Sequence, residues 1–204
     1  MSYDQLASDQ DIEKTIAALK TNGINALVVD TGQQAKEKIL KLVPQNEEVM
    51  TMSSVTLETI RLPEVLNESG RYKSVRKELM TLNRETQHLQ MNKLGSAPHF
   101  AVGSAQAVTQ DGKILMASNT GSQLPAYAYG AGHVILVIGT QKIVANLDEA
   151  MKRLYDYVLP LESDHVNKLF NMTAGSNVSK LLIINKEFKA GRITIIFVKE
   201  KLGF

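Results

Sequence analysis

The sequence contains no cysteine and no tryptophan. Without cysteine, the chain cannot form a disulfide framework, provide a thiol nucleophile, or ligate zinc or an iron–sulfur cluster through thiolates. The sequence also lacks a Walker phosphate-binding loop and a Gly-x-Ser-x-Gly nucleophile elbow. The histidines are too far apart for the i,i+3 or i,i+4 spacing of a helical metal site: His88, His99, His133 and His165. We therefore expect no metal and no cofactor.

The chain also lacks a strong charge of either sign and a long apolar segment. Its 23 basic and 21 acidic residues give a net charge of +2, which is too small to indicate nucleic-acid binding. The longest aliphatic run, Val134–Ile138, is far shorter than the roughly 20 residues that span a bilayer. The segment Met1–Gln5 is polar and acidic, unlike a secretory signal. We expect a cytoplasmic protein with no nucleic-acid partner and no membrane partner.

What the sequence does contain is an alternation of helical periodicity and short apolar runs. Val134–Ile138 is apolar on both faces, which is typical of a central parallel strand. Asp111-Gly112 lies between two short apolar runs and predicts a β-hairpin. The other predicted strands are Ile24–Val29, Val49–Met52, Phe100–Val102, Leu181–Ile184 and Ile193–Val198.

Helical patterns fill the segments between these strands. Ser8, with Asp11 three residues later, resembles a capping box. A long helix is predicted from Ser74 to Leu94, and another begins at Asn146 and ends at Pro160. Strands that alternate with helices predict a three-layer α/β/α domain with a mostly parallel sheet, elaborated by the hairpin. We expect residues 1–204 to form this single domain, with residues 1–48 as its N-terminal helix–strand–helix portion.

Small polar loops directly follow several of the predicted strands. In an open parallel sheet, ligands bind outside the carboxyl ends of the strands, where such loops meet. Glycine lets backbone approach a ligand, free N–H groups favour an anion, and Lys142 adds a positive charge. We therefore predict that the loops bind a small anionic metabolite, a carboxylate or a phosphate. The candidate ligand-binding residues are Ser53, Ser54, Thr56, Ser104, Gln106, Asn119, Thr120, Gly121, Ser122, Gly139, Thr140 and Lys142.

A simpler interpretation of these loops stays open, because Ser, Thr, Asn and Gly are also the residues that turns and helix caps use. For catalysis, the sequence offers Glu58 and Lys142 as candidates. Glu58 is also explained by the first turn of a helix, where a carboxylate is favourable. Asp111, another possible base, is better explained by the hairpin turn.

Several of these residues resemble the lactate-utilization (LUD) domain family. The family pattern is a Thr-x-Asp-Gly hairpin, a Thr-Gly element, a Tyr-Gly pair and a strand that ends in Gly-x-x-Lys-Ile-Val. Order and spacing agree over roughly residues 50 to 204. The matching segments are Ser54–Leu57, Ala107–Gly112, Asn119–Gly121, Tyr129-Gly130, Val134–Gly139, Gln141–Val144 and Leu202–Phe204.

The resemblance implies a fold like that of ribose-5-phosphate isomerases and CoA transferases. It also implies a link to the oxidation of L-lactate to pyruvate, where such domains occur beside iron–sulfur and FAD-type oxidoreductase subunits. Two departures matter. The family commonly follows its Thr-Gly with Asn-Arg, whereas this chain has Ser122-Gln123 and so lacks a guanidinium suited to a carboxylate or phosphate. Some members carry a cysteine cluster where this chain has Asn171–Asn177.

Three functions follow as hypotheses. The first is binding of a small anionic metabolite in or near L-lactate oxidation. The second is a non-catalytic subunit that docks onto an iron–sulfur or oxidoreductase partner. The third, by fold analogy, is an isomerase or acyl-transfer enzyme that uses Glu58 or Asp111. The apolar segment Leu159–Leu161 could also pair two copies of the chain as a homodimer.

Overall fold

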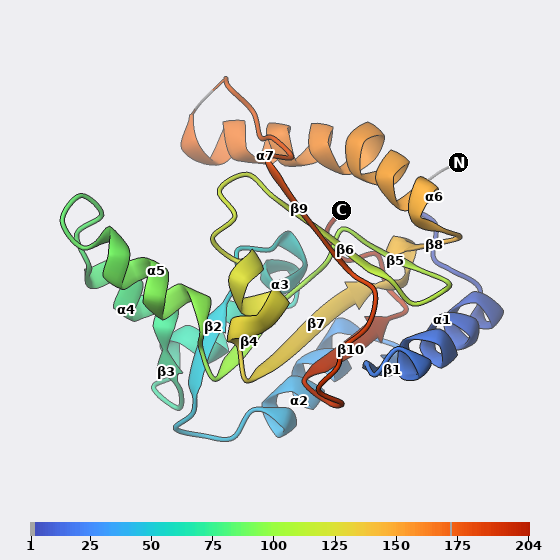
Figure 1. Ribbon diagram of the computed structural model, residues 1–204, viewed down its shortest axis with the longest axis horizontal. Helices are drawn as coiled ribbons and strands as arrows, with labels where there is room; N and C mark the ends of the chain where they lie inside the picture. The colour runs from blue at the N-terminus through green and yellow to red at the C-terminus, as the bar shows by residue number, and fades with distance from the viewer. Residues whose placement is uncertain (1–2, 172) are drawn as a thin grey trace.

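The computed structural model describes residues 3–171 and 173–204. A parallel sheet of six strands, sheet A, lies at its centre (Figure 1). Its strands pair in the order β1 (Asn25–Val29), β10 (Ile193–Val198), β7 (His133–Gly139), β4 (Phe100–Gly103), β2 (Glu48–Thr51) and β3 (Lys73–Ser74). Every pairing is parallel, so the carboxyl ends of all the strands meet at one edge.

The alternation of side chains along the central strands divides the core into two layers. In β7, Val134, Leu136 and Ile138 point to one face of sheet A, while Ile135 and Val137 point to the other. The second face is covered by α2 (Gly32–Leu42), α3 (Val55–Thr59) and the short turn η1 (Glu64–Glu68). The apolar pattern on both faces explains why this strand is central.

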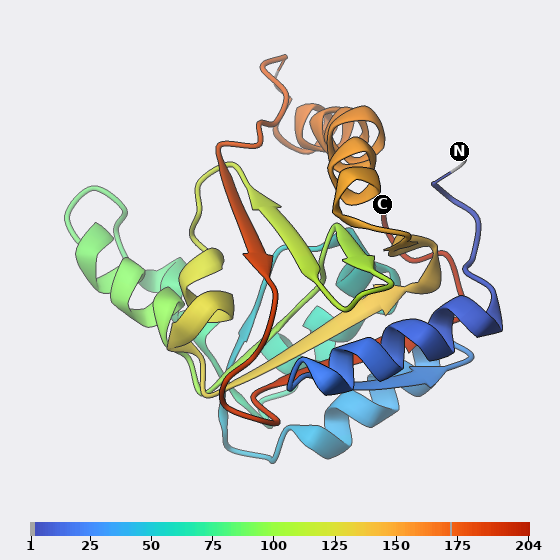
Figure 2. The same cartoon turned by 45° about the vertical axis from the view of Figure 1, so that its right-hand side comes forward.

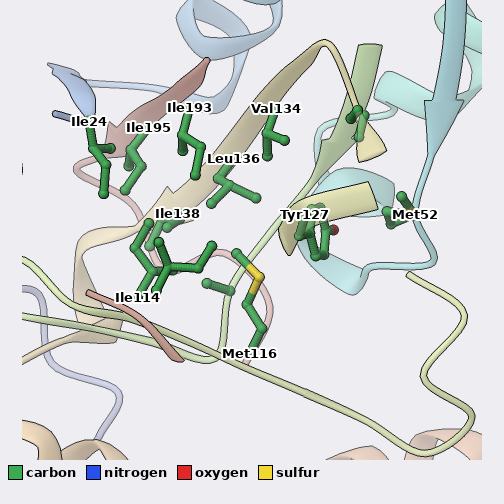
Figure 3. Packing of buried hydrophobic residues seen from close by; sticks show 14 of the residues in the cluster. Ile24, Met52, Ile114, Met116, Tyr127, Val134, Leu136, Ile138, Ile193 and Ile195 are labelled. Carbon is green, nitrogen blue, oxygen red and sulfur yellow. The ribbon is translucent and has the colours of Figure 1, made fainter. Parts of the chain in front are cut away.

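The first face of sheet A is covered by helices and by a second sheet. The helical elements are α1 (Asp9–Thr21), α4 (Val75–Thr81), α5 (His88–Ser96) and the turn η2 (Ala126–Gly130). Sheet B pairs its strands in the order β8 (Ile143–Val144), β5 (Ala107–Thr109), β6 (Ile114–Ser118) and β9 (Lys180–Ile184). Figure 3 shows Ile114 and Met116 of β6 in the same core as Leu136 and Ile138 of β7.

A long helical rod lies above sheet B (Figure 2). It consists of α6 (Leu147–Lys152), a segment of π-helical turns η4 (Arg153–Val158) and α7 (Leu159–Phe170). Its first half, α6 and η4, packs on the outer face of that sheet. The short turn η3 (Thr140–Lys142) connects β7 of sheet A to β8 of sheet B. Within residues 3–171 and 173–204, no helix is both long enough and apolar enough to cross a membrane.

The predicted fold class is confirmed: helices cover both faces of a parallel sheet, and the hairpin of β5 and β6 adds to it. The hairpin is larger than expected, because β9 joins β6 in antiparallel pairing instead of entering sheet A. Two helix predictions were wrong. The stretch from Ser74 to Leu94 is two helices, because the Asn83 side chain accepts hydrogen bonds from the N–H groups of Glu85 and Thr86 and replaces the helical pattern.

The helix that begins at Asn146 continues past Pro160 to Phe170. Proline removes one backbone hydrogen bond from a helix interior. Here the π-helical turns of η4 come immediately before α7, and Pro160 lies in the first turn of α7, where a proline is tolerated. The wide turns thus allow one rod to form where the sequence predicts an end.

Candidate functional site

A cavity of about 390 Å³ lies at the carboxyl edge of sheet A. Its walls come from the loops that follow β2, β4 and β6, from η3, and from one face of α7. Figures 1 and 2 show α7 above this edge, with sheet B beside it. A volume of this size is at the lower end of the range for pockets that bind small organic molecules.

Lys142 is the buried cation of the cavity wall. Its Nζ atom donates hydrogen bonds to Thr56 Oγ1 at 2.9 Å and to Ser104 Oγ at 3.3 Å. Only 2% of the residue is exposed. Among the ion pairs of residues 3–171 and 173–204, none includes Lys142. Buried lysines are rare unless they are paired, so this arrangement requires an explanation.

Burial lowers the pKa of Lys142 to about 7, and the positive charge of Arg153 acts in the same direction. Desolvation disfavours the charged form of an amine, and a nearby cation disfavours it further. Near neutral pH, Nζ is therefore divided between the ammonium and the free amine. The ammonium form can bind an anion, and the free amine can attack an electrophile.

The C-terminal segment positions Thr56. The hydroxyl of Thr56 donates to the carbonyl oxygen of Leu202 at 3.1 Å, and Gln141 Nε2 donates to the same oxygen at 3.0 Å. Gly203 has a φ of +61°, and a Cβ atom there would lie 2.6 Å from Thr56 Oγ1. Only glycine fits this approach. Since its proton goes to Leu202, Thr56 Oγ1 is free to accept from Lys142.

Tyr127 of η2 contributes to the cavity lining and is fully buried. Figure 3 shows it in the same core as Met52 and Leu136. A Cβ atom at Gly103 would lie 1.8 Å from the Tyr127 hydroxyl oxygen. Burial raises the pKa of Tyr127, and a hydrogen bond with the backbone of Ser104 acts in the opposite direction. Tyr127 therefore contributes a neutral hydroxyl group to the site at neutral pH.

Two further ionisable residues line the cavity. Arg76 of α4 donates from Nη2 to Ser53 Oγ at 2.7 Å and is partly exposed. Glu162 of α7 also lines the cavity, and burial raises the pKa of its carboxyl group. The side of the cavity formed by η4, α7, the segment before β9 and the C-terminal tail is otherwise mainly apolar, and the part formed by α7 is called its roof. The apolar residues are Leu154, Val158, Leu159, Val166, Phe170, Val178 and Phe204.

Arg153 lies behind this wall, fully buried at the start of η4. Its Nη1 atom donates to the carbonyl oxygen of Gln106 at 2.5 Å, and its guanidinium lies over the ring of Tyr157. Within the described parts of the chain, Nε and Nη2 have no hydrogen-bond partner. Burial lowers the pKa of Arg153 to about 10, so it remains cationic at neutral pH.

Most of the predicted ligand-binding residues line the cavity: Ser53, Ser54, Thr56, Ser104, Gln106, Asn119, Thr120, Ser122 and Lys142. Three others do not. Gly121, at a φ of +85°, forms a turn against Lys180. Gly139 allows close contact with Gln141 and the Glu200 backbone, and Thr140 is completely buried. That the cavity binds a ligand stays a prediction.

The predicted acidic residues lie elsewhere. Glu58 is exposed and is absent from the cavity lining. Asp111 accepts a hydrogen bond from Thr109 and pairs with Lys113 within the hairpin turn. In the described residues, no group of three His, Asp or Glu side chains could hold a metal ion.

Sequence reasoning missed Arg76, Tyr127 and Glu162. Arg76 follows the two-residue strand β3, which is too short to recognise from an apolar pattern. Glu162 belongs to the part of the rod beyond Pro160 that the sequence predicts to be non-helical. Tyr127 carried a signal, because the predicted Thr120–Gln123 loop leads directly to it.

Comparisons with known proteins agree with this fold. The family model of the LUD domain matches residues 12–198. The structure is similar to that of a DUF162 family protein from Deinococcus radiodurans, at 11% identity, over 95% of this chain and 99% of that chain, with a TM-score of 0.58. At this identity the likeness shows the fold alone. The sequence matches none of the curated proteins.

Two isomerase structures give weaker similarities. A D-ribose-5-phosphate isomerase in complex with phospho-erythronic acid has 12% identity and a TM-score of 0.41, over 82% of this chain and 94% of that chain. Ribose 5-phosphate isomerase from Plasmodium falciparum has 10% identity and a TM-score of 0.40, over 85% and 95%.

Proposed function

The chain belongs to the LUD domain family, and we propose that it binds a small anionic metabolite, a carboxylate or a phosphate, in the cavity at the carboxyl edge of sheet A. The observation that carries the proposal is the environment of Lys142. This buried cation has hydroxyl partners but no carboxylate among the described residues, and it lies in the wall of an open cavity. A ligand anion would supply the missing negative charge.

The remaining lining supports the same ligand chemistry. Hydroxyl groups of Ser53, Ser104 and Thr120 can donate to ligand oxygens, and Arg76 adds a guanidinium at the wall formed by α4. Arg76 offers the kind of group that the family's usual Asn-Arg would provide and that Ser122-Gln123 does not. Glu162 is the acidic residue of the lining, and burial raises the pKa of its carboxyl group, so a ligand anion beside it would favour its protonated form further.

A link to L-lactate oxidation rests on the family resemblance. L-Lactate and pyruvate are therefore the first ligands to test, followed by ribose 5-phosphate and inorganic phosphate. The cavity has room for more than three carbons, and its apolar roof suits a ligand with an aliphatic part.

Binding of these four anions to the full chain can be measured by calorimetry and thermal shift. We expect at least one of them to bind, with about 10- to 150-fold weaker binding in Lys142→Met, since losing one charged contact costs about 1.5–3 kcal/mol. The matched control is Lys186→Met, which removes an exposed lysine outside the cavity. Binding should also weaken above pH 7, because Nζ loses its proton there. If no anion binds, or if Lys142→Met binds like the control, the proposal is wrong.

Docking onto an oxidoreductase subunit is a second candidate function. Leu169 and Phe170, at the end of α7, are large apolar side chains exposed to solvent. Isolated exposed side chains are common, but an adjacent pair can contribute to an interface. Purification from the native host separates the two functions. A partner that is lost on replacing Leu169, which is absent from the cavity lining, with serine favours docking, whereas a chain that elutes alone argues against it.

A further inference from the structure

We propose that Lys142 is a nucleophile that forms an imine with the carbonyl carbon of an aldehyde or ketone in the cavity. This activity goes beyond anion binding, because it uses the free amine of Nζ and does not require a charged ligand. The proposal begins from the partners of Lys142. Both are hydroxyl oxygens, Thr56 Oγ1 and Ser104 Oγ, and both contacts are compatible with an uncharged amine.

A structural lysine is usually held by a carboxylate, which keeps its nitrogen protonated and unreactive. The groups around Lys142 have the opposite effect. Burial lowers the pKa of Lys142 most, and the cationic Arg153 lowers it further. Glu162 is the acidic residue of the lining, and burial favours its neutral form. These surroundings release the proton from Nζ near pH 7, the state in which a lysine can attack.

Access to Nζ is the second requirement. Lys142 contributes to the lining of the cavity although almost none of its surface reaches bulk solvent. A carbonyl compound that fills the cavity would meet the amine at a buried part of the cavity wall. The bound compound also displaces water from around the amine, and because imine formation releases water, this displacement favours the condensed product.

The chemistry balances without any further reactant. Nζ adds to the carbonyl carbon, forming a C–N bond, and the carbonyl oxygen takes up a proton to give a carbinolamine. The C–O bond then breaks, and the oxygen leaves as water. We assign the proton transfers to Glu162, the carboxyl group of the cavity lining: it accepts each proton that Nζ releases and passes it to the oxygen, so the water carries both hydrogens that Nζ has lost and the carboxyl group ends in its starting form.

Reductive trapping tests the proposal on the full chain. The protein is incubated at pH 7 with butanal or with pyruvate in the presence of sodium cyanoborohydride, and the modified peptides are identified by mass spectrometry. Exposed lysines are almost fully protonated at pH 7, so we expect Lys142 to be modified at least about 10-fold faster than they are. Modification that spreads over exposed lysines, with Lys142 no faster, would overturn the proposal.

Variants separate reactivity from folding. Lys142→Arg keeps a cation at the site but cannot form an imine, so its rapid modification should be lost, while Lys186→Met should behave like the parent chain. Arg153→Met removes a cation that is absent from the cavity lining. We expect it to move the midpoint of the pH–modification curve upwards, and an unchanged midpoint would show that Arg153 does not control Lys142. Glu162→Gln should slow the modification without abolishing it.

The two probes also distinguish this proposal from the anion-binding function. Trapping of butanal but not of pyruvate supports the nucleophile and contradicts binding of a carboxylate. Trapping of pyruvate supports both. Anion binding by calorimetry without trapping of either probe contradicts the nucleophile and leaves the binding function standing.

Discussion

The opposite edges of sheet A each contain a buried cation, and the two cations have different partners. Arg192, directly before β10 at the amino edge, is only 7% exposed. It forms an ion pair with Glu187 at 2.7 Å and donates to the carbonyl oxygens of Tyr127, Ala128 and Ala131. Lys142, at the carboxyl edge, has two hydroxyl partners and no acid among the described residues.

The difference indicates different tasks. Arg192 connects the β9–β10 loop to η2, and its charge and hydrogen-bond donors are used within the protein. Lys142 has a charge that the protein does not neutralise, at a place where a cavity opens. A buried cation that pairs with a carboxylate of the same protein helps to hold the fold together. A buried cation without such a partner lowers the stability of the protein, and an anionic ligand or the loss of its proton in a reaction can offset that cost.

The largest effect is expected at the amino edge. Replacing Arg192 with methionine leaves Glu187 buried without its partner and three carbonyl groups without a donor. Breaking one side of a buried ion pair typically costs about 3–5 kcal/mol, and we expect a loss of that size. Urea denaturation at pH 7 measures it. A loss of less than about 1 kcal/mol would show that solvent replaces the contacts and that the two edges are more alike than their geometry indicates.

The same replacement at Lys142 should have the opposite sign. The pKa of Lys142 is about 7 in the folded chain, against 10.5 for an unperturbed lysine. Each unit of this pKa difference corresponds to about 1.4 kcal/mol of stability that the buried charge costs at low pH. The variant also loses two hydrogen bonds, which cost about 1 kcal/mol each. Lys142→Met should therefore stabilise the protein by about 2–3 kcal/mol at pH 6.

The pH dependence of the folding stability shows whether the unpaired charge of Lys142 is the cause of this difference. Between pH 7 and 10.5, the unfolded chain keeps the proton that folded Lys142 has released, so the stability of the parent chain rises with pH. The advantage of Lys142→Met is therefore greatest below pH 7 and shrinks as the pH approaches 10. Denaturation curves of both proteins at pH 6 and 9.5 check this. A destabilised variant, or an advantage that grows with pH, would contradict the unpaired-charge interpretation.

A smaller effect is expected from Gly103→Ala, which tests how tightly the carboxyl edge is packed. The new Cβ atom would meet the Tyr127 hydroxyl, which is buried and has little room to move. Overpacking of this kind should cost about 1–2 kcal/mol. In the Tyr127→Phe background the cost should fall, because the closest atom is gone. Equal costs in both backgrounds would place the strain elsewhere.

The smallest effect is expected from Lys186→Met, the exposed counterpart of both buried cations. Lys186 lies in the loop between β9 and β10 and is exposed. Surface substitutions of this kind usually change stability very little. A change comparable to that of Lys142→Met would show that any lysine replacement affects this protein, and the comparison between the edges would lose its meaning.

Much of the fold could be predicted from local patterns. The apolar run in β7, the Asp111-Gly112 turn and the Ser8 cap each follow from chemistry within a few residues, and each lies where predicted. The sheet in which β9 pairs could not be predicted in this way. Its strand character is local, but its pairing with β6 instead of sheet A depends on tertiary packing.

The site was predictable in outline but not in its electrostatics. The rule that loops meet at the carboxyl edge of a parallel sheet brought together Ser53, Ser104 and Lys142. Nothing local indicates that Lys142 is buried without an acid, because this depends on which side chains come from distant elements. Arg153 and Glu162 both belong to the rod, one in π-helical turns and one beyond Pro160, where sequence rules are weakest.

The placement of α7 has a consequence for kinetics. None of its residues is fully buried, yet one of its faces forms the roof of the cavity through Leu159, Glu162 and Val166. Elements with few buried contacts are the first to open, at free energies far below that of global unfolding. We therefore expect α7 to move in small excursions about the wide turns of η4, while the two sheets and the residues around Lys142 keep their geometry. The rate at which a molecule enters or leaves the cavity would then depend on α7, and the choice of molecule on the residues around Lys142.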